Sequence, residues 1–131
     1  MASGIVLVDK PLGLSSHSAV SGVRKALDTK KVGHAGTLDP AATGLLMMGV
    51  GAGTRLLTYL VGLDKSYTAT LRLGYETTTD DAEGESVGET STVLASVSDD
   101  AIRGALEPFR GEIDQVPSTY SAIKVEGKRA Y

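Results

Sequence analysis

Two short apolar segments with a helical period between them place the strongest constraint on the fold of this 131-residue chain. Residues 5–8 and 45–50 are too short for core helices and predict buried strands. One face of the intervening stretch carries four apolar residues at helical spacing, Ala19, Val20, Val23 and Leu27. Ser15 or Ser16 is expected to cap this helix. The pattern predicts a domain in which strands and short helices alternate.

The rest of the chain gives weaker signals of the same kind. Apolar and polar residues alternate from Ser66 to Gly74, which predicts a half-buried antiparallel strand. A short helix is expected over residues 56–61, and a last strand over Ser121–Glu126. Ser98 is placed to cap a further helix with a core stripe of four apolar residues, Ala101, Ile102, Ala105 and Leu106. Residues 76–100 contain eight acids and no base, and predict a long solvated loop or hairpin tip.

Composition excludes several classes of protein. The chain has no cysteine, so it holds no disulfide framework, and we expect it in a reducing cytoplasm. The two histidines lie seventeen residues apart, which argues against a histidine-rich metal site, and we expect no metal. No apolar run approaches the roughly 20 residues that a membrane-spanning helix needs. We therefore expect no membrane partner.

The formal net charge of −3 hides an asymmetry. Residues 1–75 hold eight bases against four acids, whereas residues 76–131 hold five bases against twelve acids. A basic half of this kind can bind phosphate locally, but charge alone favours ordinary surface charge.

The segment with glycines at 49, 51 and 53 resembles a phosphate-binding loop, because it lies between a predicted strand and a predicted helix. Thr54 stands where a dinucleotide fingerprint needs its third glycine. Close packing between strand and helix is therefore the better interpretation of this segment.

Residues 32–40 have neither a helical nor a strand period, and their glycines and proline predict a shaped loop. Within it, Asp39 precedes Pro40, whose ring restricts the aspartate backbone to extended geometry. A carboxylate fixed in this way suits nucleophilic or base chemistry. For an isolated Asp-Pro pair, an Asx-turn is the better interpretation. Within the same loop, His34 is able to stack on a base, to donate a hydrogen bond, or simply to form hydrogen bonds within its own loop.

These residues belong to ordered motifs that resemble the TruB family of tRNA pseudouridine synthases. Similar motifs cover nearly the whole chain. The most informative blocks are Asp9-Lys10-Pro11-x-Gly13-x-Ser15-Ser16, Gly33-His34-x-Gly36-Thr37-Leu38-Asp39-Pro40 and Gln115-x-Pro117-Ser118-x-Tyr120. The Gly-Thr-Leu-Asp-Pro block is shared with guide-RNA-dependent relatives of the family. The resemblance implies an α+β fold: a mixed, mostly antiparallel sheet with packed helices, here incomplete.

The resemblance also implies an activity. The expected reaction isomerises uridine to pseudouridine in the T-loop of tRNA, at tRNA position 55, without a cofactor. Asp39 aligns with the essential aspartate of the family, as nucleophile or base. Tyr67 aligns with a tyrosine that lies against the target base and assists proton transfer at C5. Attack on the sugar, attack on the uracil ring, and formation of a glycal all stay open as routes.

Contacts with tRNA are assigned through the same resemblance. His34 aligns with a histidine that meets the RNA near the extruded uridine. Lys10 is expected either to support the floor of the active site or to contact phosphate. Four further cations are candidates for contacts with the RNA backbone, Lys30, Lys31, Arg55 and Lys65.

The resemblance covers only about the first half of the family's catalytic domain. Residues 1–131 are therefore expected to be its N-terminal portion, without the later strands, the arginine that pairs with the aspartate, or the C-terminal PUA domain. This chain by itself is expected to have little activity. Two alternatives stay open: the catalytic subunit of a guide-RNA particle, and a tRNA-binding chaperone without chemistry.

Overall fold

The structure is a computed structural model that describes residues 2–89, 91, 96–116, 121–125 and 128–130. The chain forms two compact units, Met1–Tyr67 (unit 1) and Thr68–Tyr131 (unit 2). Both combine short helices with strands, and all strand pairs in the described residues are antiparallel. The α+β class predicted from the sequence is confirmed.

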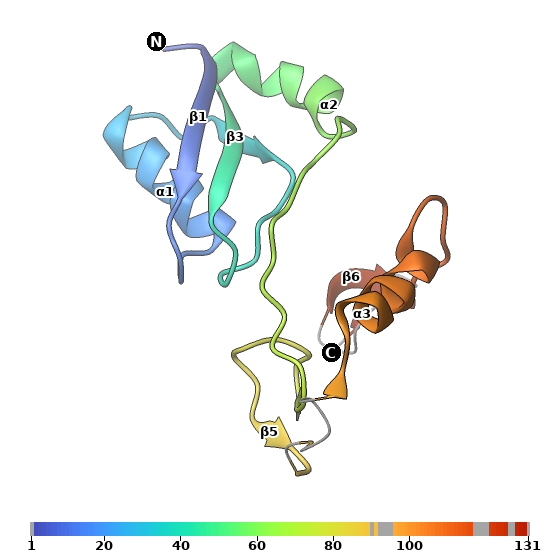
Figure 1. The fold of residues 1–131 in the computed structure, drawn as a ribbon. Coiled ribbons are helices and arrows are strands. Elements are labelled where there is room, and N and C mark those ends of the chain that lie inside the picture. The colour runs from blue at the N-terminus through green and yellow to red at the C-terminus, as the bar shows by residue number, and fades with distance from the viewer. Residues whose placement is uncertain (1, 90, 92–95, 117–120, 126–127, 131) are drawn as a thin grey trace. The chain divides into compact units, whose positions relative to one another are not determined.

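Unit 1 is built on a three-stranded sheet in the order β1–β3–β2 (Figure 1). Strand β1 (Gly4–Lys10) pairs along its whole length with β3 (Gly44–Val50), and β2 (Val32–Ala35) pairs with the other edge of β3. Both apolar segments that predicted strands, residues 5–8 and 45–50, lie within β1 and β3. The sheet has two ends: one where Lys10 faces Gly44, and one where Gly4 and Val32 both face Val50.

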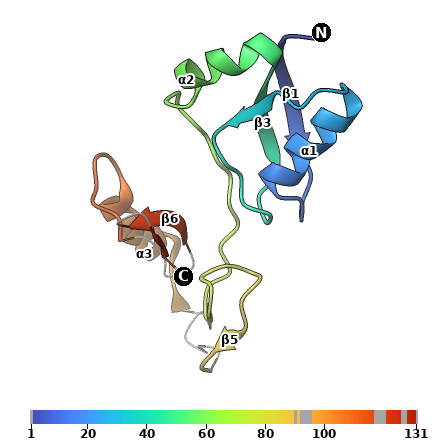
Figure 2. The same cartoon turned by 180° about the vertical axis from the view of Figure 1, so that it is seen from behind.

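Helix α1 (Ser16–Ala26) covers one face of this sheet, as the view from behind shows (Figure 2). Ser15 caps it, since the Ser15 Oγ accepts a hydrogen bond from the Ser18 amide at 3.1 Å. The core between helix and sheet consists of seven buried residues, Ala19, Val20, Val32, Leu38, Leu46, Met48 and Val50. Burial of a side chain such as Leu or Met is worth about 1.5–3 kcal/mol, so this core is the main source of stability in unit 1. The predicted helix and its stripe are confirmed, except that Leu27 is exposed.

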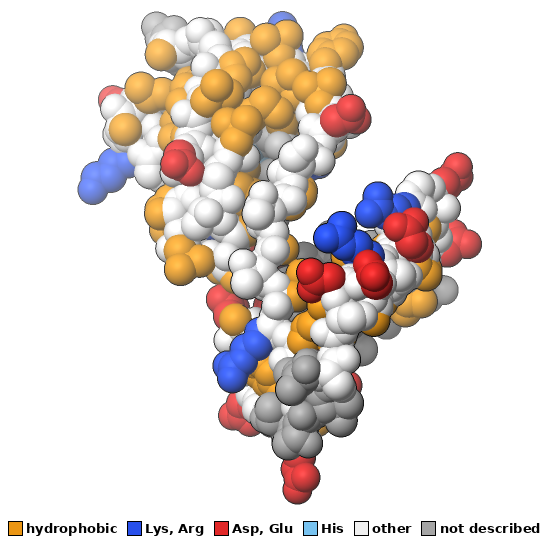
Figure 3. Space-filling view, viewed as in Figure 1, with side chains coloured by type: hydrophobic (Ala, Val, Ile, Leu, Met, Phe, Trp, Pro, Cys, Tyr) orange, Lys and Arg blue, Asp and Glu red, His pale blue; other side chains and the backbone are white. Residues whose placement is uncertain are grey.

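The opposite face of the sheet is apolar and exposed. Three of its side chains, Ile5, Leu7 and Leu45, are 37%, 65% and 62% exposed. Hydrophobic side chains gather over β1, β3 and the following helical segment in the space-filling view (Figure 3).

The glycines at 49, 51 and 53 pack closely, as the sequence predicted. Gly49 lies in β3, and Gly51 and Gly53 belong to the 3-10 helix η1 (Gly51–Leu56), which leads into the short helix α2 (Leu57–Leu60). A Cβ at Gly49 would lie 2.7 Å from the Gly53 carbonyl oxygen, and a Cβ at Gly53 would clash with the Gly4 carbonyl. Only the absence of side chains lets the backbone of η1 approach β1 and β3 this closely.

Two sequence predictions for unit 1 need correction. Residues 32–35 form strand β2 rather than loop, because pairing with β3 supplies an order that their own period lacks. The short helix is real but begins earlier, with the 3-10 turn of η1, and only Leu57 of its predicted apolar side is buried.

Unit 2 contains a small hairpin, a helix and a second hairpin. Strands β4 (Glu76–Thr77) and β5 (Ser86–Val87) form the first hairpin, so the acidic segment is a hairpin tip in part. Ser98 caps α3 (Asp99–Leu106) through the Ala101 amide, as predicted, and η3 (Glu107–Phe109) follows. Strand β6 (Ser121–Val125) confirms a strand in the expected segment, whose last residue, Glu126, lies outside the described residues. It is not the last strand, because it pairs with β7 (Lys128–Ala130).

Two further predictions are wrong for unit 2 and the segment that leads into it. Residues 66–74 form no strand, although their alternation fits one, because no described neighbour pairs with them. The predicted core stripe of α3 is exposed, with Ile102 and Leu106 at 37% and 47%. Alternation and helical period specify which face is apolar, but burial also needs a partner.

Candidate active site

Asp39 lies on the connection between β2 and β3, at the end of the sheet where Lys10 faces Gly44. Its side chain is exposed, whereas the side chain of the preceding Leu38 is buried in the core. The Ala42 amide donates a hydrogen bond to the Asp39 carbonyl at 3.0 Å, which closes a turn. The backbone turn therefore involves the main chain of Asp39 and leaves the carboxylate available.

The residue after Asp39 is anchored from the segment that follows β1. The Pro40 carbonyl accepts hydrogen bonds from the Gly13 amide at 2.8 Å and from the Lys10 Nζ at 3.4 Å. Gly13 has φ +77°, a conformation that favours glycine and aims its amide at the loop. Sequence reasoning had not assigned this contact, although Gly13 belongs to the first quoted motif.

Lys10 is fully buried, and its ammonium group donates to three main-chain carbonyls. The shortest of these bonds, 2.7 Å, reaches Leu14, and a second, 3.1 Å, reaches Pro11. A charged group without exposed surface is tolerated only when its donors are satisfied in this way. The arrangement supports the first of the two expected roles of Lys10, the floor of the site, rather than contact with phosphate.

His34 stands at the third position of β2 and is half-buried. Its Nδ1 contacts the carbonyl oxygen of Gly36, and a carbonyl can only accept, so Nδ1 carries the proton. His34 therefore forms a hydrogen bond within its own loop, which is one of the three predicted roles. In the neutral ring, Nε2 is left as an acceptor.

Lys65 is brought to the same loop from a distant part of the chain. Its Cε and Nζ lie 3.5 and 3.6 Å from the position that a Cβ at Gly36 would occupy. Gly36 has φ +88°, so this position suits glycine for its backbone and also leaves room for the lysine. An exposed ammonium group beside the Asp39 loop can meet a phosphate there.

Tyr67 ends unit 1, and its side chain is 66% exposed. It does not belong to a strand, so the predicted placement on an apolar strand face is not found. Its role against the target base stays a prediction.

The other predicted cations lie at the opposite end of the sheet. The Gly51 amide donates to the Lys31 carbonyl at 2.8 Å, which joins the turn of Lys30 and Lys31 to η1, the helix of Arg55. Six strand steps separate this end from Lys10, which is about 20 Å. The structure thus divides the predicted RNA-binding set into a group at the Asp39 loop and a distal group of Lys30, Lys31 and Arg55.

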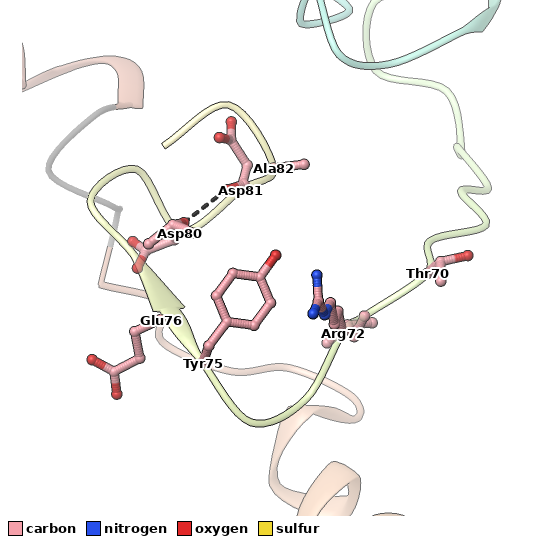
Figure 4. A pocket seen from close by; sticks show the side chains of 9 residues that line it. Thr70, Arg72, Tyr75, Glu76, Asp80, Asp81 and Ala82 are labelled. Carbon is pink, nitrogen blue, oxygen red and sulfur yellow. Dashed lines mark hydrogen bonds between the residues drawn. The ribbon is translucent and has the colours of Figure 1, made fainter. Parts of the chain in front are cut away.

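Unit 2 contains an open hollow of about 310 Å³ (Figure 4). The Arg72 guanidinium lies 4.6 Å from the centroid of the Tyr75 ring, a cation–π contact that orients both side chains. The lining residues are Thr70, Leu71, Arg72, Tyr75, Glu76, Thr77, Asp80, Asp81 and Ala82. Sequence reasoning did not identify this hollow, and no motif signals it.

Asp81 organises the tip of the first hairpin of unit 2. Its Oδ1 accepts hydrogen bonds from the Thr79 hydroxyl at 2.6 Å and from the Glu83 amide at 2.9 Å. The Thr79 bond, and then the Glu83 bond, hold the pKa of the Asp81 carboxyl below its usual 3.8. Hydrogen bonds to the ionised form are the cause, since the group is exposed to solvent.

Among the described residues, no cluster of three or more histidine, aspartate or glutamate side chains could hold a metal ion. In the same part of the chain, no helix has the length and apolar character needed to cross a membrane.

The fold and the aspartate loop define the class of protein first: a small α+β domain that presents the exposed carboxylate of Asp39 on a loop at the end of an antiparallel sheet. A family model described as TruB family pseudouridylate synthase (N terminal domain) matches residues 24–131. The chain belongs to this family.

Relatives named tRNA pseudouridine synthase B share much of the sequence. The one from Arthrobacter sp. (strain FB24) is 59% identical over 131 residues, which is 100% of this chain and 42% of the relative. The one from Leifsonia xyli subsp. xyli is 54% identical over 132 residues, 100% of this chain and 44% of the relative. The chain thus spans less than half the length of these relatives.

A solved structure is similar as well. A chain in the crystal structure of a Cbf5-Nop10-Gar1 complex has a TM-score of 0.58 and 29% sequence identity. The similarity covers 92% of this chain and 31% of that chain. This likeness agrees with the α+β fold.

Proposed function

We propose that the protein containing this chain isomerises uridine to pseudouridine in tRNA, in the T-loop at position 55, without a cofactor. Membership of the TruB family and the names of the relatives support the reaction. One structural observation carries the assignment of the site. Asp39 presents an exposed carboxylate, while the residues on both sides of it are fixed.

The reaction needs an anion held against a nucleoside. The bond between uracil N1 and C1′ of the ribose breaks, and a bond between C5 and C1′ forms. C5 loses its proton and N1 ends protonated, so no oxidant or reductant is required. The exposed carboxylate of Asp39 can provide this anion. Attack on C1′, attack on the uracil ring and removal of the 2′ proton are all compatible with such an anion.

The uridine must leave its stack before Asp39 can reach it, because a base inside a folded loop does not expose C1′ and C5. Extrusion costs a few kcal/mol, and contacts with the swung-out nucleotide recover part of this cost. We assign these contacts to His34 and Tyr67, with Tyr67 also assisting proton transfer at C5. We also assign Lys65 to a phosphate next to the reacting nucleotide, and its position beside Gly36 supports this assignment.

The distal group of Lys30, Lys31 and Arg55 has a different task in this proposal. These cations lie at the end of the sheet away from Lys10, about 20 Å along β1. We assign them no part in the chemistry, but they can bind the backbone of a longer RNA. A substrate that contacts both ends of unit 1 must be larger than a single nucleotide, which fits a tRNA arm.

Replacement of Asp39 by Asn tests the proposal in the full-length natural gene product. Unmodified tRNA labelled with tritium at C5 of uridine releases the label when pseudouridine forms. We expect Asp39→Asn to abolish release and to keep tRNA binding. Asp100→Asn, at an exposed aspartate of α3 outside the family motifs, should leave both unchanged.

The alternatives give different results in the same assay. A chaperone without chemistry would bind tRNA and release no tritium even as the wild type. The subunit of a guide-RNA particle would need added guide RNA. Normal release by Asp39→Asn would show that another group performs the chemistry.

A further inference from the structure

Ser16, the first residue of α1, uses its hydroxyl group on a residue far away in the sequence. Its Oγ accepts a hydrogen bond from the Leu38 amide and donates one to the Leu38 carbonyl, both at 2.9 Å. Ser16 is only 4% exposed. The helix does not need this hydroxyl for its cap, because Ser15 already supplies the capping oxygen.

The two bonds hold both main-chain groups of the residue immediately before Asp39. Leu38 is also held through its side chain, which is 9% exposed within the core. On the other side of the aspartate, the Pro40 carbonyl is bonded to Gly13 and Lys10. The Asp39 Cα therefore lies between two residues whose main chains are held by hydrogen bonds.

We propose that Ser16 is a positioning residue for the Asp39 carboxylate, a role that rests on the proposed function. Without the hydroxyl, the Leu38 amide and carbonyl would be buried and unpaired, and such groups move toward water to recover hydrogen bonds. A shift of about 1 Å in a reacting group costs on the order of 100-fold in rate. Substrate binding depends on other residues, so the loss falls on kcat.

The test compares variants of the full-length natural gene product. Ser16→Ala removes both bonds, and Ser16→Thr keeps a hydroxyl. Ser21→Ala is the matched control, because Ser21 is an exposed serine of the same helix that donates only to the His17 carbonyl. The measurements are kcat and KM for tritium release from tRNA, and hydrogen exchange of the peptide that covers residues 37–44.

We expect Ser16→Ala to lower kcat at least tenfold, with KM within twofold of the wild type and faster exchange in residues 37–44. Ser16→Thr should recover kcat to within threefold, and Ser21→Ala should match the wild type. If Ser16→Ala does not fold, Ser16→Cys replaces it, and a folded, slow Cys variant beside an active Thr variant supports the role.

A kcat within threefold of the wild type for Ser16→Ala, or a loss that Ser16→Thr and Ser16→Cys share equally, would overturn the role of Ser16. An increase in KM that accounts for the whole loss would overturn it as well. Asp39→Asn, measured in parallel, separates this failure from that of the proposed function. Asp39→Asn must be inactive for the proposed function to stand, whatever Ser16→Ala does.

Discussion

Replacement of Lys10 by Met should lower the free energy of unfolding of unit 1 by about 2–4 kcal/mol. Lys10 is 0% exposed and donates to the carbonyls of Pro11, Leu14 and Pro40 at 3.1, 2.7 and 3.4 Å. A hydrogen bond from a charged donor contributes about 1.5–3 kcal/mol, so the two shorter bonds give about 3–6 kcal/mol. The substitution also removes a buried charge, whose desolvation cost offsets part of this gain.

Urea unfolding followed by circular dichroism, with hydrogen exchange of the β1 and β3 amides, measures the change. Lys65→Met is the matched control, because Lys65 is an exposed lysine that lies over Gly36. It should stay within about 0.5 kcal/mol of the wild type, as surface substitutions usually do. If Lys10→Met is equally close to the wild type, the buried ammonium does not hold the loop and the reasoning is refuted.

Three further predictions follow from single contacts. The pKa of the Asp81 carboxyl is lower in the folded hairpin than its usual 3.8, so ionised Asp81 stabilises the hairpin at pH values above 3.8. This stabilisation is lost as the pH falls through the folded pKa. An NMR titration midpoint at or above 3.8 would contradict this. Gly53→Ala should destabilise unit 1 by about 1–3 kcal/mol in thermal melts, because the new Cβ would clash with the backbone of Gly4. Gly62→Ala is the control and should be nearly neutral, because the space around Gly62 is open. Equal melting temperatures of the two variants would be inconsistent with the close packing at Gly53. Combined replacement of Lys31 and Arg55 by Gln should weaken tRNA binding and leave kcat unchanged. The slope of log binding constant against log salt concentration should fall in magnitude by about 0.7–0.9 for each phosphate contact removed. An unchanged slope would exclude both residues from the interface.

Local signals in the sequence predicted most elements of this fold correctly. The apolar run at residues 5–8 became β1, and Ser98 caps α3 as its position suggested. Strand and helix periods and caps depend on residues within a few positions of each other, so a single sequence contains them. The family motif around Asp39 is local in the same way, so the sequence alone contains it.

Pairing over long distances was decided only by the tertiary structure. Residues 32–35 became a strand because β3 pairs with them, whereas residues 66–74 have the period of a strand and no described partner. Strand pairing joins segments that are distant in the sequence, and the period of one segment does not report whether the other is present.

The roles of individual polar residues were decided in the same way. Lys10 and Lys31 look alike in the sequence, yet one is buried under the Asp39 loop and the other lies at the far end of the sheet. The hydroxyl of Ser16 meets a backbone 22 positions away. The amino-acid sequence by itself determined the family of this chain and the motif around Asp39. Only the folded chain decided which side chains hold that motif in place, because burial and hydrogen bonding depend on neighbours that the sequence does not place next to each other.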